Sequence, residues 1–458
     1  MRKVTVIGGG GVRTPLVIHG LAQAQQLLQI DRLALYDVDE ERVQTIARLG
    51  REILRRANAD FEIRVSSRLE EAAEGADFVV NSIRAGGIAA RARDERIAIE
   101  HDLAGQETTG PAGVAMALRT IPVTLQHARI VERVAPGAWF INFTNPAGLI
   151  TQALQQHTGL RVIGICDTPS ELFHKIAEAA GEAPGEMVFD YAGLNHLGWV
   201  RRVLLRGEDI TERLLSDTEF LRRVYPTGLF DPELIRTLRL IPTEYLFFYY
   251  SQRKAHANQV RAGASRGEEI GRLNADLFQR LASADAALGL AVYRAYLLQR
   301  NVSYMKLEAR AESAFQVSAF QVAKEDYDPF ETATGYHRIA LDVMTSLICG
   351  QSRSAVVNVR NGGAIEDLEA DDVVEVPCDI DRDGPRPRRT GRLPDSVRGL
   401  VQSVKAYERT TIRAAMTGSG SLAQLAMLEC PIIGQWELAA SLRTSLIDGD
   451  PEFLGYLK

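Results

Sequence analysis

The sequence lacks several features that mark other classes of protein. Four cysteines in 458 residues (Cys166, Cys349, Cys378 and Cys430) are too few and too scattered for a disulfide framework, which predicts a protein of the reducing cytoplasm. No apolar run is long enough to cross a bilayer, and the first one is too short for a signal-peptide core. The net charge of −6 gives no basic excess for a nucleic-acid surface. We therefore expect a cytoplasmic protein that binds neither a membrane nor nucleic acid.

The chain does contain enough apolar residues for a large core. Its 46% hydrophobic content and its length predict two domains. In the first, apolar strand-like segments alternate with helical ones and end in polar loops; they lie at residues 4–7, 32–36, 78–82, 139–143 and 162–165. This alternation predicts an α/β fold with a Rossmann-like, doubly wound sheet over residues 1–198.

The second domain, residues 199–458, is predicted to be mixed and mainly helical α/β. The sequence shows amphipathic stretches at 266–300 and 395–417 and a strand-like segment at 356–376. Residues 381–389 are rich in proline, glycine and arginine, which predicts an exposed loop.

A glycine-rich turn follows the first strand. Gly8, Gly10 and Gly11 would let the backbone approach a pyrophosphate at the start of the next helix, although Arg13 replaces the third glycine of the usual fingerprint. Asp37, at the end of the second strand, could accept both ribose hydroxyls of NAD and would repel the additional phosphate of NADP. The alternatives are a turn without a nucleotide and an Asp37 that only caps a helix. Together the two features favour NAD.

A cysteine and a histidine suggest a metal beside this cofactor. Cys166 ends a buried apolar strand, and His196 lies in a glycine-rich segment thirty residues later. A thiolate with an imidazole suits a borderline divalent ion. Asp167 could act as a general acid. The alternatives are a small buried cysteine, a core histidine and a helix-capping aspartate.

Many short segments together resemble glycoside hydrolase family four, the NAD- and metal-dependent glycosidases. They follow the family's order along nearly the whole chain, at residues 83–87, 90–95, 105–111, 142–148, 166–169, 193–196, 242–250, 361–365 and 374–378. The resemblance implies a redox-assisted elimination rather than hydrolysis by two carboxylates. NAD⁺ removes hydride from carbon 3 of the sugar, a base takes the proton on carbon 2, and the group on carbon 1 leaves. Water then adds, and the hydride returns.

The resemblance also implies roles for individual residues. Cys166 and His196 match the metal ligands, with Mn²⁺ as the usual ion. Tyr245 matches the carbon-2 base, although from helical periodicity alone Tyr249 or Tyr250 could take its place. Asp167 matches an acid that some members use, while others, especially β-specific ones, carry Asn there.

Four further residues match positions that contact the substrate. Asn145 and Glu107 correspond to sugar-contacting residues, Arg91 to an arginine that contacts a 6-phosphate, and Arg266 to a second candidate contact. The pattern is closest to the 6-phospho-β-glucosidase branch, and it implies a homodimer or homotetramer.

One difference from the family pattern leaves the identity of the substrate open. Gly11, Val12 and Arg13 stand where phospho-specific members usually carry a serine and an aromatic residue. The same chemistry on a non-phosphorylated or uronic acid glycoside is therefore the main alternative. A lactate/malate-type NAD-dependent dehydrogenase and an inactive NAD-sensing module are more distant ones.

Overall fold

The computed structural model describes the chain except for residues 306–329, 331–334 and 351. The described part contains one 13-stranded sheet. Six strands are parallel and lie in the order β3-β2-β1-β4-β5-β6. Their bounds are β1 Arg2–Ile7, β2 Ile30–Tyr36, β3 Glu62–Ser66, β4 Phe78–Asn81, β5 Trp139–Asn142 and β6 Arg161–Gly164. This is the strand order of a dinucleotide-binding sheet, so the predicted Rossmann-like half is confirmed.

The central parallel strands β1 and β4 are mostly apolar and buried because helices cover both faces of the sheet, whereas the edge strand β3 is half exposed. Val4, Val6 and Ile7 of β1 are at most 1% exposed, and all four residues of β4 are buried. The polar loops that the sequence indicated follow the carboxyl ends of β1, β2, β4 and β6.

An antiparallel half extends the same sheet. Its strands are β7 Met187–Leu194, β8 Leu197–Leu205, β9 Glu208–Asp209, β10 Ile241–Pro242, β11 Arg353–Arg360, β12 Val373–Asp381 and β13 Gly384–Pro387. β11 pairs with β6 through Asn358 and Gly164, and β12 pairs with β7 through Glu375 and Gly193. Residues far apart in sequence therefore meet next to the end of β6.

The prediction of an exposed loop at residues 381–389 is wrong in part. Residues 384–387 form β13, which pairs with β12 in a hairpin. Gly384 has a φ of +108° and turns the chain at the tip of the hairpin, and Arg388 and Arg386 pair with Asp379 and Asp381. The glycine that suggested a loop serves a tight turn, and the charges pair across the two strands.

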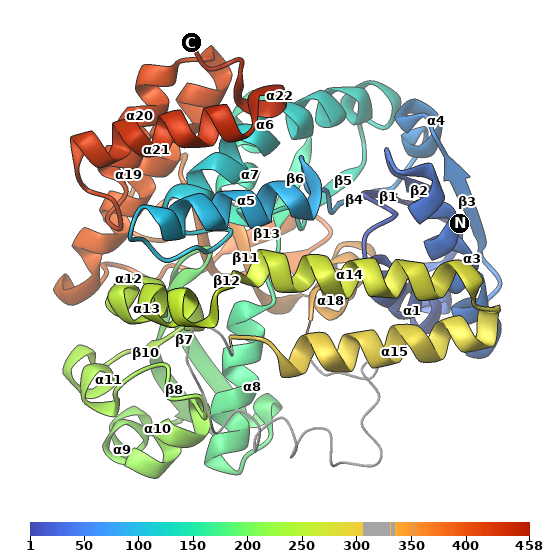
Figure 1. Ribbon diagram of the computed structural model, residues 1–458. Coiled ribbons are helices and arrows are strands. Elements are labelled where there is room, and N and C mark those ends of the chain that lie inside the picture. The colour runs from blue at the N-terminus through green and yellow to red at the C-terminus, as the bar shows by residue number, and fades with distance from the viewer. Residues whose placement is uncertain (306–329, 331–334, 351) are drawn as a thin grey trace.

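Helices surround the sheet (Figure 1). Those of the first half are α1 Thr14–Gln23, α2 Gln25–Leu28, α3 Glu40–Ala57, α4 Leu69–Ala73, α5 Gly87–Glu100, α6 Gly110–Val134, α7 Ala147–His157 and α8 Thr168–Ala180. Later ones are α9 Thr211–Ser216, α10 Thr218–Val224, α11 Pro232–Leu238, α12 Phe247–Tyr250, α13 Gln252–Ala262, α14 Arg266–Ser283, α15 Ala286–Val302, α18 Tyr336–Cys349, α19 Asp395–Thr417, α20 Gly420–Glu429, α21 Trp436–Gly449 and α22 Pro451–Leu454. Two short 3₁₀ turns, η1 Pro184–Glu186 and η2 Glu244–Leu246, complete the elements.

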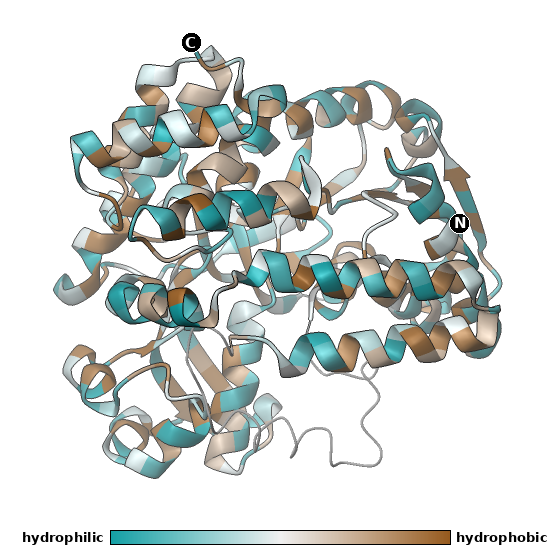
Figure 2. Cartoon of the chain, viewed as in Figure 1, coloured by the Kyte–Doolittle hydropathy of each residue, from teal (hydrophilic) through white to brown (hydrophobic). Residues whose placement is uncertain are grey.

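The predicted amphipathic stretches are confirmed as α14 with α15, and as α19. Figure 2 shows apolar and polar residues alternating around α14 and α15, which pack against each other. No helix among the described residues is long and apolar enough to cross a membrane. The predicted division at 198/199 falls inside β8, and the sheet runs through both halves, so that boundary stays a prediction.

Candidate active site

The glycine turn after β1 is shaped by close contacts that exclude side chains. Gly8 has a φ of +88°, and a Cβ placed there would lie 2.3 Å from the backbone oxygen of Ser82. α1 then begins at Thr14 with Pro15 in its first turn, as the sequence indicated. The turn therefore presents bare backbone at a helix N-terminus, which suits a pyrophosphate.

Asp37 lies against this turn. Its two carboxylate oxygens accept the backbone N–H groups of Gly10 at 2.8 Å and Asp39 at 3.1 Å. Asp39, not Asp37, caps α3 by accepting the N–H of Arg42. Asp37 is therefore not the cap of α3. Its carboxylate lies next to Gly10, at the place where the ribose of a dinucleotide would follow the pyrophosphate. These residues fit NAD.

His196 forms the tip of the β7–β8 hairpin. It adopts a φ of +61°, which is strained for a non-glycine residue, and its ring is buried. Nδ1 lies 2.7 Å from the hydroxyl of Thr108, whereas Nε2 is buried without a hydrogen-bond partner among the described residues. Burial lowers the pKa of His196 to about 4, so the ring is neutral at pH 7. A neutral ring with one unused nitrogen is a suitable metal ligand.

Tyr245 lies on the face of this ring. The two rings stack with centroids 3.7 Å apart and planes 7° from parallel. Tyr304 lies near the Tyr245 side chain and donates its hydroxyl proton to Glu244 at 3.2 Å. Burial, together with the charge of Glu107, raises the pKa of Tyr245 well above its usual value. A cation bound nearby would act in the opposite direction.

The structure separates Tyr245 from the two tyrosines that periodicity left as alternatives. Tyr249 interacts with Tyr407, and Tyr250 lies beside Trp199 and Phe230. Of the three, Tyr245 is the one stacked on His196.

Cys166 follows β6 and is 2% exposed. Burial, with the charges of Glu375 and Asp167, raises the pKa of its thiol, and the Cys166 sulfur in turn acts on Tyr245. Tyr245 therefore stacks on His196 and lies within range of the charge of a Cys166 thiolate. The described residues contain no group of three or more histidine, cysteine and acidic side chains suited to a metal, so these two would leave positions open for substrate oxygens.

Beneath Cys166 lies a buried carboxylate. Glu375 is 0% exposed and accepts hydrogen bonds from Tyr191 at 2.8 Å, Asn358 at 2.9 Å and Asn195 at 3.3 Å. Burial raises the pKa of Glu375 to about 7, and the three donors oppose that rise. This acidic group adds negative potential on the protein side of the proposed metal position.

Asp167 precedes α8 but does not cap it through its side chain. Its carboxylate lies 3.5 Å from the guanidinium of Arg13, which comes from the glycine turn. The residue that was predicted as a general acid is thus tied to the cofactor loop.

The predicted substrate contacts Glu107, Arg91 and Asn145 come together. Glu107 lies 2.7 Å from both Arg91 and Arg84 and accepts the Asn145 amide at 3.3 Å. Arg91 also pairs with Glu95 at 2.7 Å. Burial would raise the pKa of Glu107, but Arg84 and Arg91 outweigh it and hold that pKa well below its usual range. Asn145 Oδ1 is buried without a partner among the described residues, as expected if a ligand donates to it.

Arg266 lies in a different set of contacts. It donates to Ser303 at 2.7 Å and to the backbone oxygen of Arg300 at 3.1 Å, and it pairs with Glu269 at 2.6 Å. Burial lowers the pKa of Arg300, and the neighbouring Arg13 and Arg266 lower it further. The charges of these three guanidinium groups therefore interact, although Arg13 is also paired with Asp167 and Arg266 with Glu269. A direct contact of Arg266 with substrate stays a prediction.

Sequence reasoning missed four residues of this site: Arg84, Thr108, Tyr304 and Glu375. Arg84 follows the end of β4, and Glu375 is a carboxylate within the apolar strand β12, so both carried a signal. Tyr304 follows α15 and carried none, because it meets Glu244 from 60 positions away.

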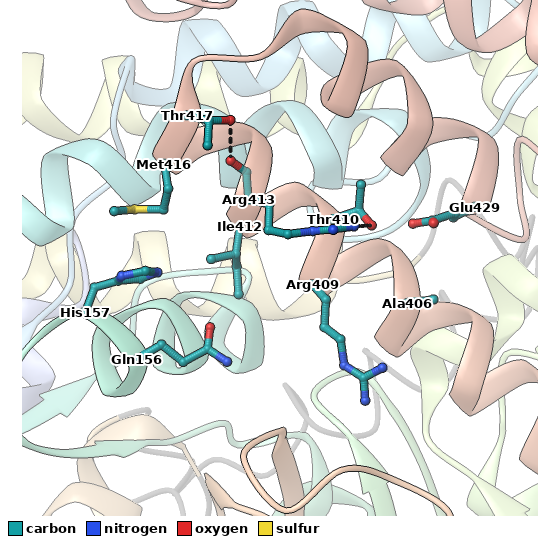
Figure 3. A pocket seen from close by; sticks show the side chains of 10 residues that line it. All are labelled: Gln156, His157, Ala406, Arg409, Thr410, Ile412, Arg413, Met416, Thr417 and Glu429. Atoms are coloured by element: carbon teal, nitrogen blue, oxygen red, sulfur yellow. Dashed lines mark hydrogen bonds between the residues drawn. The ribbon is translucent and has the colours of Figure 1, made fainter.

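A groove lined by other residues lies along α7 and α19 (Figure 3). It has a volume of about 590 Å³ and is lined by Gln156, His157, Ala406, Arg409, Thr410, Ile412, Arg413, Met416, Thr417 and Glu429. None of the predicted site residues is among them, so it is not the candidate active site.

Comparison with known proteins identifies the family of this chain. Two family models match the chain: "Family 4 glycosyl hydrolase" at residues 3–182, and "Family 4 glycosyl hydrolase C-terminal domain" at residues 191–433. The 6-phospho-beta-glucosidase of Escherichia coli (strain K12) is 30% identical over 94% of this chain and 91% of that protein.

Two solved structures share the whole architecture. One is the 6-phospho-beta glucosidase from Thermotoga maritima with manganese, NAD⁺ and glucose-6-phosphate, with a TM-score of 0.81, 27% identity and 99% coverage of both chains. The other is a 6-phospho-alpha-glucosidase from gut microorganisms in complex with NAD and glucose-6-phosphate. Its TM-score is 0.81 at 25% identity, covering 100% of this chain and 99% of that one. Because the two family models together span most of the sequence, this chain belongs to family 4 of the glycosyl hydrolases.

Proposed function

We propose that the protein hydrolyses 6-phospho-β-glucosides with bound NAD and a divalent metal, Mn²⁺ being the first candidate. The observation that carries the proposal is the stack of Tyr245 on His196, whose buried Nε2 has no hydrogen-bond partner among the described residues. This arrangement suits removal of a proton next to a polarised carbonyl. It does not provide the two-carboxylate geometry of ordinary glycosidases.

Both NAD and the metal have candidate binding residues in this chain. Gly8, Gly10, Gly11 and Asp37 would hold NAD, and Cys166 and His196 would hold the metal. The chemistry that these groups supply when bound is reversible oxidation at carbon 3 of the sugar and polarisation of the resulting carbonyl, which acidifies the proton on carbon 2.

The side chains would then move protons. Tyr245 would hold the proton taken from carbon 2, with its ring held against that of His196. Asp167 is the candidate proton donor to the leaving oxygen on carbon 1, and it would have to take up a proton first, because its ion pair with Arg13 favours the carboxylate. Glu107 and Asn145 would bind sugar hydroxyls.

Charge supports a phosphorylated substrate. Arg84 and Arg91 pair with Glu107, the proposed sugar-binding residue, and the charges of Arg13 and Arg266 act on the buried Arg300. Relatives named 6-phospho-beta-glucosidase support the β configuration, while the α-specific relative keeps the anomer in need of a direct test.

The test is incubation with NAD⁺ and Mn²⁺ in D₂O with α- and β-nitrophenyl glucosides, each with and without a 6-phosphate. We expect release of nitrophenol from the 6-phospho-β-glucoside with deuterium at carbon 2 of the product. Net accumulation of NADH without nitrophenol release would indicate a dehydrogenase instead.

A second candidate keeps the chemistry and changes the substrate. Arg13 stands where phospho-specific relatives usually lack a cation, and it could pair with the carboxylate of a uronic acid glycoside. Nitrophenyl glucuronides and unphosphorylated glucosides belong in the same panel, and faster turnover of either would favour this candidate. A cytoplasmic location and a homodimer or homotetramer complete the proposal.

A further inference from the structure

The segment before α6 contains a buried chain of hydrogen bonds that ends on His196. Gln106, Thr108, Thr109 and His196 are all less than 9% exposed. Gln106 Oε1 is the acceptor of three bonds: from the N–H of Thr108 at 2.7 Å, the N–H of Thr109 at 2.9 Å and the hydroxyl of Thr108 at 2.8 Å.

The donors and acceptors present determine the direction of each hydrogen bond in this series. Two backbone N–H groups can only donate, so the Gln106 atom that they share must be the carbonyl oxygen and not the amide nitrogen. An oxygen cannot donate to the Thr108 hydroxyl either. The single hydroxyl proton of Thr108 therefore points to Gln106, and the Thr108 oxygen is left to accept.

The remaining contact of Thr108 is His196 Nδ1, at 2.7 Å. Because the Thr108 oxygen accepts, Nδ1 carries the proton, and Nε2 of the neutral ring holds a lone pair. The opposite tautomer would lose the bond from Thr108 to Gln106. It would also leave a buried Nε2–H without an acceptor among the described residues.

Rotation of the His196 ring does not offer an alternative set of hydrogen bonds. Tyr245 covers one face of it at 3.7 Å, and a half-turn of the ring would place carbon Cδ2 against the Thr108 oxygen.

We propose that Gln106 and Thr108 are positioning residues that hold His196 in the Nδ1–H tautomer and so keep the Nε2 lone pair ready for the metal. The importance of this lone pair rests on the proposed function, in which His196 is a metal ligand. The tautomer itself is a property of the metal-free protein. Outer partners that fix a ligating histidine in this way typically change metal affinity 10- to 100-fold when removed.

The first measurement needs no metal. In apo protein labelled with ¹⁵N-histidine, the ring nitrogens of His196, assigned by the signal that His196→Gln removes, report the tautomer directly. We expect a protonated Nδ1 and an unprotonated Nε2 in the wild-type protein, and a mixture or the opposite tautomer in Thr108→Val. A protonated Nε2 in the wild-type protein, or an unchanged tautomer in Thr108→Val, would overturn the proposal.

The second measurement is Mn²⁺ affinity by electron paramagnetic resonance. We expect Thr108→Val to weaken binding by about 10-fold or more, and Thr108→Ser, which restores the hydroxyl, to return it to within about threefold. Thr120→Val is the matched control, because Thr120 is a buried threonine of α6 whose hydroxyl has no partner among the described residues. An equal loss in Thr120→Val and Thr108→Val would mean that the effect is structural and would overturn the proposal. If His196→Gln leaves Mn²⁺ affinity unchanged, the assignment of the metal ligand fails, whereas the tautomer measured in the apo protein still decides the hydrogen-bond chain.

Discussion

At the scale of single residues, charge balance around the substrate site decides what each substitution does. Arg84 and Arg91 face Glu107, and Glu95, which is 0% exposed, completes a group of two cations and two anions. Removing either partner of a buried pair typically costs about 3–5 kcal/mol, because the other charge is left unpaired. Substitutions that keep the charge and alter the geometry are therefore the informative ones.

Arg91→Lys keeps the cation but loses the two-nitrogen fork that joins Glu95 and Glu107. We expect kcat/KM for 6-phosphorylated glucosides to fall about 10-fold or more, with a change below about threefold for any unphosphorylated substrate. Steady-state kinetics on the two substrates, with urea unfolding to check stability, measure this. An equal loss on both substrates would mean that Arg91 positions Glu107 and does not contact the phosphate.

Asp37→Asn tests the cofactor assignment with a built-in comparison. The amide oxygen can still accept from Gly10, but the charge that would bind the ribose hydroxyls is lost, so we expect NAD affinity to fall about 10-fold or more and the preference over NADP to shrink. Asp39→Asn makes the same change of charge two residues away, and Asn also caps helices, so it should leave NAD affinity unchanged. Titration by NADH fluorescence measures both variants, and equal effects would contradict the assignment.

At the scale of elements, what the sequence could predict depends on how local the cause is. The parallel strands other than β3, α1 with Pro15, and the long helices α14, α15 and α19 were predictable because apolar periodicity, caps and glycine turns are local properties. β3 was not predicted, because its sequence EIRVS has no apolar run and only Ile63 is buried. β13 was not, because its pairing partner decides whether a Gly-Pro segment is a loop or a strand. The same holds for the site. Cys166, Asp167 and Asp37 stand at strand ends and were predictable, whereas the Tyr304 contact requires α15 to end beside η2.

The packing of α18 on α1 adds a dependence of stability on pH. His337 is 3% exposed, and burial, with the charge of Arg338, lowers its pKa to about 4 from an ordinary 6.5. Between these values the unfolded chain binds a proton that the folded chain does not, so stability falls as pH decreases from about 6.5 towards 4. From pH 7 to pH 5 the contribution of His337 is about 2 kcal/mol.

His337→Phe removes this group. We expect its free energy of unfolding to fall between pH 7 and pH 5 by about 2 kcal/mol less than that of the wild-type protein, whatever the offset between the two at pH 7. Urea unfolding at both pH values, with equal slopes required, gives the comparison. Parallel curves for the two proteins would show that His337 is not kept neutral by the fold.

At the scale of the whole molecule, the two matched family segments share one sheet and one core. β11 and β12 lie between β6 and β7, so residues 353–381 join two groups of strands that come from the first 205 residues, β1 to β6 and β7 with β8. Buried apolar residues from Val4 to Leu457 belong to a single cluster. A division near residue 198 would expose the edge of β6 and cut β8, so we infer that the chain folds as one cooperative unit despite its length.

This continuity leads to a calorimetric prediction. We expect one unfolding transition for the whole chain, and NAD at 100 times its dissociation constant should shift the entire transition, adding about 2.7 kcal/mol to the free energy of unfolding. A fragment of residues 1–198 should fail to give a cooperative transition, because it lacks β11 and β12 beside β6. Two separate transitions, of which NAD shifts only one, would instead establish the two domains as independent. In that case NAD would stabilise only the first domain and not the segment that carries Tyr245. If the chain unfolds in one transition, NAD binding stabilises the Tyr245 segment as well.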